Sequence, residues 1–149
     1  DWDGNGTDTF AVRRGNTYHV LNSIRSGDAD EKFNYGRTED VTHVGDWNGD
    51  GSDTFAVTRG TAFFVKNSLA GGSADQQFTY GRAGDEVLAG DFDGDGLDTL
   101  SIRRGNVLYV NNRLAGGSAD FTYAYGNASD ALFIGDFDGD GIDTPAVRR

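Results

Sequence analysis

The residues of this chain whose chemistry is easiest to interpret are aspartates at a fixed spacing. The nonapeptide DFDGDGLDT, residues 91–99, places Asp91, Asp93 and Asp95 at its positions 1, 3 and 5, with a glycine at position 6. Alternate carboxylates in a tight turn can direct oxygen atoms to one point, as needed by Ca²⁺, which takes roughly six to eight oxygen ligands. Without a cation, carboxylates this close would repel one another. The nonapeptide therefore predicts a calcium-binding loop.

The nonapeptide occurs four times with a step of 45 residues, starting at Asp1, Asp46, Asp91 and Asp136. The predicted ligands are the side chains at positions 1, 3, 5 and 8 and the main-chain carbonyl group at position 7, where the residue type varies. The aspartate at position 8 is interpreted as the ligand that closes the loop. The candidates for up to four Ca²⁺ ions are Asp1, Asp3, Asn5, Thr7, Asp8, Asp46, Asn48, Asp50, Ser52, Asp53, Asp91, Asp93, Asp95, Leu97, Asp98, Asp136, Asp138, Asp140, Ile142 and Asp143.

Other interpretations of the loop fit the sequence less well. An EF-hand has a bidentate glutamate at position 12, whereas position 12 is Val or Ile in all four loops here. A turn of Asp and Gly that binds nothing is common as a single copy, but four copies with three or four acids each argue against it. Mg²⁺ is disfavoured because it seldom occupies an all-protein site. Asn5 and Asn48 replace aspartates in the first two loops, which predicts weaker binding there.

The 45-residue period organises the rest of the sequence as well. Residues 1–45, 46–90 and 91–135 form three full units of one continuous repeat domain, and residues 136–149 begin a fourth. Periods of this length indicate repeat architectures such as solenoids and propellers. Positions that recur in every unit serve folding rather than one active centre. Among them, an arginine in each unit is expected to pair with an aspartate; these residues are Arg14, Arg59 and Arg104, and Asp40, Asp85 and Asp130.

Each unit is predicted to contain four short strands. In the first unit they cover residues 9–14, 17–21, 32–35 and 41–45, and the last strand leads directly into the next loop. Apolar residues alternate along these segments, as in half-buried strands, and Gly15-Asn16 marks a turn between the first two. Four strands in about 45 residues is the size of one blade of a β-propeller.

The segment YGRAGDEVLAGDFDGDG, residues 80–96, resembles the FG-GAP/VCBS-type repeat, with Tyr-Gly in place of the usual Phe-Gly. The resemblance covers the whole chain, because motif and period agree four times. It implies an all-β fold of tandem four-stranded antiparallel β-propeller-type blades, with calcium loops between units. It also implies ligands at positions 1, 3 and 5 and a closing aspartate. That family usually closes its loop at position 9, whereas this chain has Asp at position 8 and Thr at position 9.

Composition and motif searches narrow the class of protein. The net charge is −11, and 14 of the 24 acidic residues lie in the four loops. There is no basic stripe for nucleic acid, no apolar stretch of roughly 20 residues for a membrane span, and no cysteine. No nucleophile–base pair is evident, so an enzyme is not expected. His19 and His43 have no counterparts in the other units and are interpreted as packing or surface residues.

These observations predict a calcium-stabilised extracellular structural or interaction module, secreted or at a cell surface. The chain starts without Met or a signal peptide, which suggests a mature or excised segment. Three units and a partial fourth cannot close a propeller of typically 4–8 blades. Self-association, in its boldest form a filament, or contact with further repeats of a longer chain is therefore expected. Asn127 is a candidate glycosylation site.

The alternative function is a calcium-dependent carbohydrate-binding, lectin-like module with a polysaccharide ligand. It would use calcium with open coordination, or the aromatic residue at position 2 of each loop. These residues are Trp2, Trp47, Phe92 and Phe137. Packing between neighbouring units is the competing explanation for these four side chains.

Overall fold

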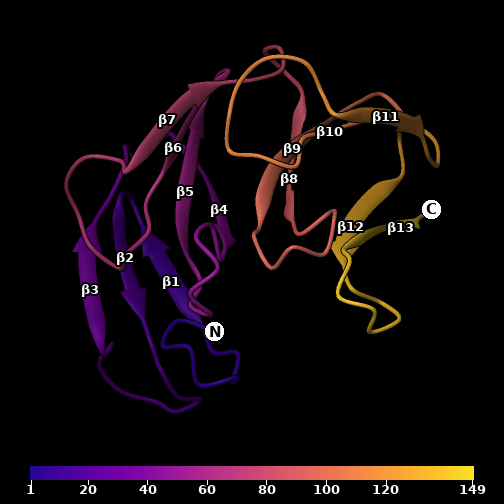
Figure 1. Cartoon of the computed structure of the whole chain (residues 1–149). Helices are drawn as coiled ribbons and strands as arrows, with labels where there is room; N and C mark the ends of the chain where they lie inside the picture. Colours follow the sequence, from indigo (N-terminus) through magenta and orange to yellow (C-terminus); the bar gives the residue numbers. More distant parts are fainter.

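The computed structural model describes all 149 residues, and its only regular elements are β-strands (Figure 1). They are β1 (Ala11–Arg14), β2 (Thr17–Val20), β3 (Glu31–Asn34), β4 (Val41–Gly45), β5 (Thr54–Arg59), β6 (Ala62–Val65), β7 (Gln76–Thr79), β8 (Glu86–Gly90), β9 (Thr99–Arg104), β10 (Val107–Val110), β11 (Phe121–Ala124), β12 (Ala131–Gly135) and β13 (Thr144–Arg148). The prediction of an all-β fold is confirmed. The structure contains no helical segment that could span a membrane.

The strands form four antiparallel sheets, numbered here in chain order. The first sheet contains β1–β3, the second β4–β7, the third β8–β11 and the fourth β12 and β13. In each sheet, strands that follow one another in sequence are also neighbours in space. The register from Val41↔Thr58 to Gly45↔Thr54 places β4 next to β5.

The sheets are shifted by one strand relative to the sequence units. β4 ends the first unit, yet it pairs with β5 of the second unit and not with β3. The reason is that the nonapeptide is a hairpin connection, so the strands on either side of it belong to one sheet. The second, third and fourth loops therefore lie inside the first hairpin of a sheet, and the first loop precedes β1; the sequence predicted the loops between units.

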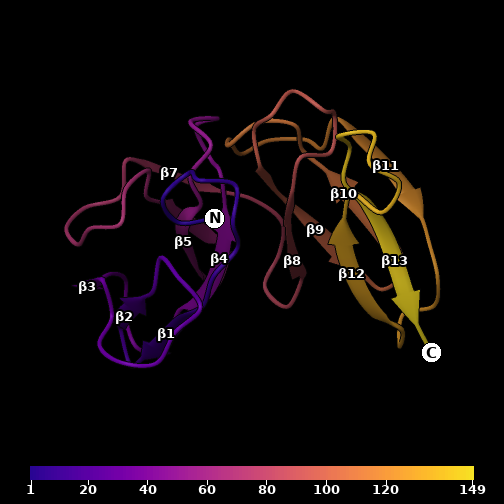
Figure 2. The ribbon, with the colours of Figure 1, turned by 90° about the horizontal axis from the view of Figure 1, so that it is seen from below.

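Figure 2 shows the four sheets following one another in chain order, with the two chain ends apart. The first strand of the third sheet, β8, contacts β4 on one side and β12 on the other. The sheets form no closed ring. The second and third sheets are four-stranded and antiparallel, whereas the first has three strands and the fourth has two.

The hydrophobic core lies between consecutive sheets. Trp2 of the first loop packs with Tyr18 of β2 and with Phe55 of β5, and its ring stacks on Phe55 with centroids 4.8 Å apart. Trp47 similarly joins residues of the second and third sheets. The outer face of the first sheet has no sheet against it, so Phe10 is 66% exposed while its counterpart Phe55 is 3% exposed.

An arginine–aspartate pair extends the first hairpin of each of the last three sheets. Arg59 donates two hydrogen bonds of 2.7 Å to the Asp40 carboxylate, whose side chain is fully buried. Arg104–Asp85 and Arg149–Asp130 are the equivalent pairs. The predicted pairing is confirmed, except that Arg14 has no such partner because no strand precedes β1 in its sheet.

Candidate cation-binding loops

The aspartate at position 1 organises each loop by accepting main-chain hydrogen bonds. Asp91 Oδ1 accepts from the N–H of Gly94 at 2.7 Å, and Asp91 Oδ2 accepts from the N–H of Gly96 at 2.8 Å. Gly94 and Gly96 have φ angles of 76° and 83°, which residues with a Cβ rarely adopt. These two glycines turn the main-chain amides toward Asp91. The fourth loop repeats these bonds around Asp136.

The second loop has the same internal organisation despite its asparagine, and the first loop keeps the bond from position 6 but has none from position 4. Asp46 accepts hydrogen bonds from Gly49 and Gly51, each at 2.8 Å, and Asp1 accepts one from Gly6 at 2.6 Å. In the second loop the Asn48 amide nitrogen donates to Asp50 Oδ2 at 3.0 Å. That hydrogen bond contributes most to lowering the pKa of Asp50.

Positions 1, 3 and 5 come together in the two loops that carry three aspartates there. One carboxylate oxygen each of Asp91, Asp93 and Asp95 lies within 4.8 Å of the other two, and the fourth loop brings Asp136, Asp138 and Asp140 together in the same way. No Lys or Arg side chain forms an ion pair with any of these six carboxylates. The donor set, hard oxygen atoms with uncompensated negative charge, fits a cation such as Ca²⁺.

The electrostatics of the third loop agree with this description. Desolvation raises the pKa of Asp93, and the negative charges of Asp95 and Asp91 raise it further. A nearby cation would act in the opposite direction and favour the ionised carboxylates. The N–H of Leu97 donates to Asp95 Oδ1 at 2.9 Å, so the main chain at position 7 borders the same group.

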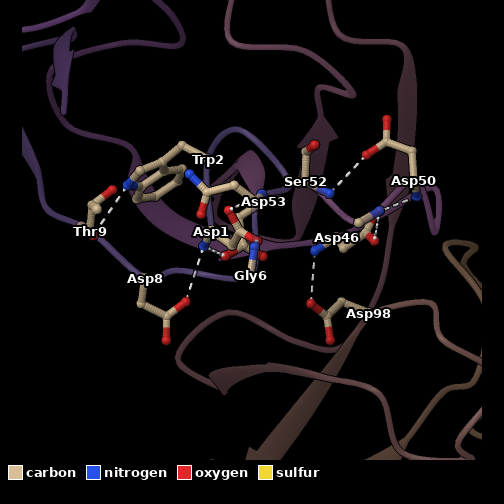
Figure 3. A network of polar contacts seen from close by, with 12 residues as sticks. Asp1, Trp2, Gly6, Asp8, Thr9, Asp46, Asp50, Ser52, Asp53 and Asp98 are labelled. Atoms are coloured by element: carbon tan, nitrogen blue, oxygen red, sulfur yellow. Dashed lines mark hydrogen bonds and ion pairs between the residues drawn. The ribbon is translucent and has the colours of Figure 1, made fainter. Parts of the chain in front are cut away.

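The aspartate at position 8 does not join the other candidates of its own loop. Asp98 Oδ2 accepts a hydrogen bond from the main-chain N–H of Asp46 at 2.8 Å, across 52 residues of sequence. Figure 3 shows the Asp98 side chain directed at Asp46, and Asp53 lying against Asp1. Asp143 contacts the Asp91 N–H in the same way, at 3.0 Å. The structure thus places these carboxylates against the preceding loop.

The setting of Asp98 is confined and partly buried. A Cβ atom at Gly45, the last residue of β4, would lie only 2.7 Å from Asp98 Oδ2. Desolvation raises the pKa of Asp98 to about 6.

The sequence analysis missed this role of Asp98, although one signal was present. A glycine directly precedes the second, third and fourth loops, at Gly45, Gly90 and Gly135. The position-8 aspartate of the first loop, Asp8, differs: its side chain is 97% exposed, and its Oδ1 lies 3.2 Å from the Asp1 amino group.

Three of the four position-2 aromatics are buried, with Trp2 9%, Trp47 2% and Phe92 8% exposed. Packing between units therefore accounts for them, and they offer no platform on which a sugar could stack. Phe137 alone is open, at 61%.

Comparison with protein-family models, with curated proteins and with solved structures yields no match to this chain.

Proposed function

We propose that the chain is a calcium-stabilised structural or interaction module of an extracellular protein, built from FG-GAP/VCBS-like repeats. The observation that carries the proposal is the pair of carboxylate triplets, Asp91/Asp93/Asp95 and Asp136/Asp138/Asp140, held by main-chain hydrogen bonds without a cationic partner. Ca²⁺ is preferred to Mg²⁺ because it accepts flexible all-protein oxygen sites.

The residues of the loop have separable roles in this proposal. The position-1 aspartate fixes the turn with its main-chain contacts. Asp91 Oδ1 accepts from three amides, whereas Oδ2 accepts from one and so keeps a lone pair for a cation. The side chains at positions 3 and 5 supply additional oxygens from the same side. A bound cation supplies the positive charge that this group of carboxylates lacks.

Extracellular calcium modules bind at roughly 10⁻⁴–10⁻³ M, which suits a millimolar environment. A cation that binds only the folded state stabilises it by RT ln(1 + [L]/Kd) at each site. For a Kd of about 1 mM, about 10 mM Ca²⁺ adds about 1.4 kcal/mol per occupied site. For a chain of this size, each kcal/mol raises Tm by roughly 2–4 °C.

Thermal melts with EGTA and with about 10 mM Ca²⁺ test the proposal, and the Tm is expected to rise in Ca²⁺ by the amount given above. A variant with Asp93→Asn, Asp95→Asn, Asp138→Asn and Asp140→Asn should lose most of that rise. Asp28→Asn, which removes an exposed carboxylate outside the loops, is the control and should retain it. An identical Tm in EGTA and Ca²⁺ would refute the function.

The module is further proposed to associate with units of its own kind, either in a longer chain or in a second copy. The support is the uncovered outer face of the first sheet, where Phe10 and Val12 are 66% and 51% exposed. The equivalent residues of the second sheet, Phe55 and Val57, are covered by the preceding unit.

A further inference from the structure

Consecutive loops are joined to one another by a repeated pair of hydrogen bonds. The main-chain N–H of Asp98 donates to the carbonyl oxygen of Asp46 at 2.9 Å, while the N–H of Asp46 donates to the Asp98 carboxylate at 2.8 Å. Asp143 and Asp91 form the same two bonds, at 2.7 and 3.0 Å. At the start of the chain the N–H of Asp53 donates to the Asp1 carbonyl oxygen, and the Asp1 N-terminal ammonium group pairs with the Asp53 carboxylate in place of an amide.

The joined loops also pack closely. A Cβ atom at Gly49, position 4 of the second loop, would lie 2.8 Å from Leu97 Cδ2 of the third loop. At Gly94 the nearest atom would be Ile142 Cγ1 of the fourth loop, at 3.0 Å. Position 4 of one loop therefore lies against the position-7 side chain of the next, and the variable residue at position 7 is an inter-loop contact.

The hydrogen bond from Asp46 joins the second and third loops at the residue that organises the second loop. The Asp46 carboxylate holds the amides of Gly49 and Gly51, while the amide of Asp46 itself is held by Asp98. Asp98 thus fixes the organising residue of the second loop from outside that loop.

We propose that Asp53, Asp98 and Asp143 are positioning residues, each for the cation loop of the preceding unit, so that neighbouring loops are coupled in a row. The inference rests on the proposed cation binding and assigns these residues to a different loop from the one that contains them. The fourth loop is the end of the row in this structure, because no carboxylate accepts from the Asp136 amide.

Residues that orient metal ligands typically change metal affinity by about 10- to 100-fold when they are removed. A loss in that range is expected at the second loop when Asp98 is truncated. The third loop retains Asp91, Asp93 and Asp95 in this variant and should keep its own binding group.

The chain carries a natural reporter for separate loops. Trp2 and Trp47 occupy position 2 of the first and second loops, where the third and fourth loops have phenylalanine. Tb³⁺ replaces Ca²⁺ in oxygen sites and emits when a nearby tryptophan is excited. In a Trp2→Phe background, emission excited through tryptophan reports on the second loop; in a Trp47→Phe background it reports on the first. Phe92 shows that the buried position accommodates phenylalanine.

The experiment titrates Tb³⁺, with Ca²⁺ as competitor, into Asp98→Ala and Asp53→Ala in both backgrounds. Asp98→Ala should weaken Tb³⁺ at the second loop by about 10-fold or more and leave the first unchanged. Asp53→Ala should weaken the first loop and leave the second unchanged. If Asp98→Ala unfolds, as judged by circular dichroism, Asp98→Asn is measured in the same way and is expected to weaken the second loop in the same direction.

The opposite pattern would overturn the inference: weakening of the second loop by Asp53→Ala, with no effect there of Asp98→Ala or Asp98→Asn. That result would mean that the position-8 aspartate closes its own loop, and it would leave the calcium function intact. Absence of saturable emission in the parent variants, with no competition by Ca²⁺, would overturn the inference for the first two loops. The calcium function is then decided separately by the thermal melts in EGTA and Ca²⁺, which also respond to the third and fourth loops.

Discussion

At the scale of single residues, equivalent positions of the repeat carry different chemistry, and His43 is an example. It lies in β4 with Nε2 3.0 Å from Thr58 Oγ1, at a position filled by Leu88 and Phe133 in the later units. Desolvation lowers the pKa of His43 to about 4. It therefore behaves as a packing residue, in agreement with its sequence interpretation.

Because an unfolded histidine has a pKa of about 6.5, the unfolded state takes up the proton first as the pH falls. His43 is therefore expected to cost stability between about pH 6.5 and pH 4, by up to about 1.4 kcal/mol per pH unit. Above pH 6.5 both states are neutral and the contribution is absent. His43→Leu should remove this slope, as measured by urea unfolding from pH 7 to pH 4.5. Parallel pH profiles for the variant and the parent would contradict the assignment.

At the scale of elements, the hairpin that carries each loop is secured at its open end by an arginine–aspartate pair. Asp40 also accepts a hydrogen bond from the Arg37 N–H at 2.8 Å. Its buried carboxylate therefore accepts from the Arg37 amide as well as from the Arg59 guanidinium. Desolvation opposes ionisation of Asp40, but Arg59 and the Arg37 amide outweigh it and lower the pKa of Asp40. The pair thus joins the last residue of β5 to the residue before β4, one step beyond the outermost register pair Val41↔Thr58.

Arg59→Ala should destabilise the protein by about 2–3 kcal/mol, less than the 3–5 kcal/mol of a fully buried pair because Arg59 is partly solvated. The mechanism is the loss of the partner of a buried carboxylate. Arg14→Ala is a matched control, since Arg14 occupies the equivalent position without a partner, and should change stability by less than about 0.5 kcal/mol. Denaturant unfolding measures both, and equal effects would show that the ion pair is unimportant.

At the scale of the whole molecule, the apolar contacts that stabilise the fold lie between consecutive sheets. Two core clusters draw buried residues from two consecutive sheets, and the third packs against partly buried Leu132 and Ile134 of the fourth sheet. A unit without a neighbour therefore leaves an apolar face uncovered. In the first sheet this face includes Phe10 and Val12. The equivalent face of the second sheet is covered by the first unit. A further unit of the same kind is therefore the partner that fits the uncovered face of the first sheet.

In Ca²⁺, the 16.0 kDa chain is expected to form concentration-dependent species of two or more copies, measured by light scattering and sedimentation. Phe10→Asp should abolish the association because it places a charge on the uncovered face. Ile24→Asp alters an exposed apolar residue elsewhere, 72% exposed, and should leave the association unchanged. A folded monomer at every concentration would refute association between copies.

The sequence by itself determined the features that depend on short-range pattern. The all-β class, the positions of the strands and the organisation of the loops followed from alternating apolar residues and from Asp and Gly at fixed spacing. The glycines at positions 4 and 6 adopt positive φ in every loop, so the turn is a local property. The repeat pattern also predicted an arginine–aspartate pair, whereas the structure decided that Arg59 pairs with Asp40 of the preceding unit.

Only the tertiary structure decided which strands share a sheet and where the position-8 aspartates point. Both depend on contacts between units: β4 could have paired with β3 or β5, and Asp98 could have turned to Asp91 or to Asp46. The loop spans only nine residues, so its sequence favours closure on itself. Packing of one loop on the next instead brings the Asp46 amide to the Asp98 carboxylate, 52 residues away along the chain, and excludes a side chain at Gly45.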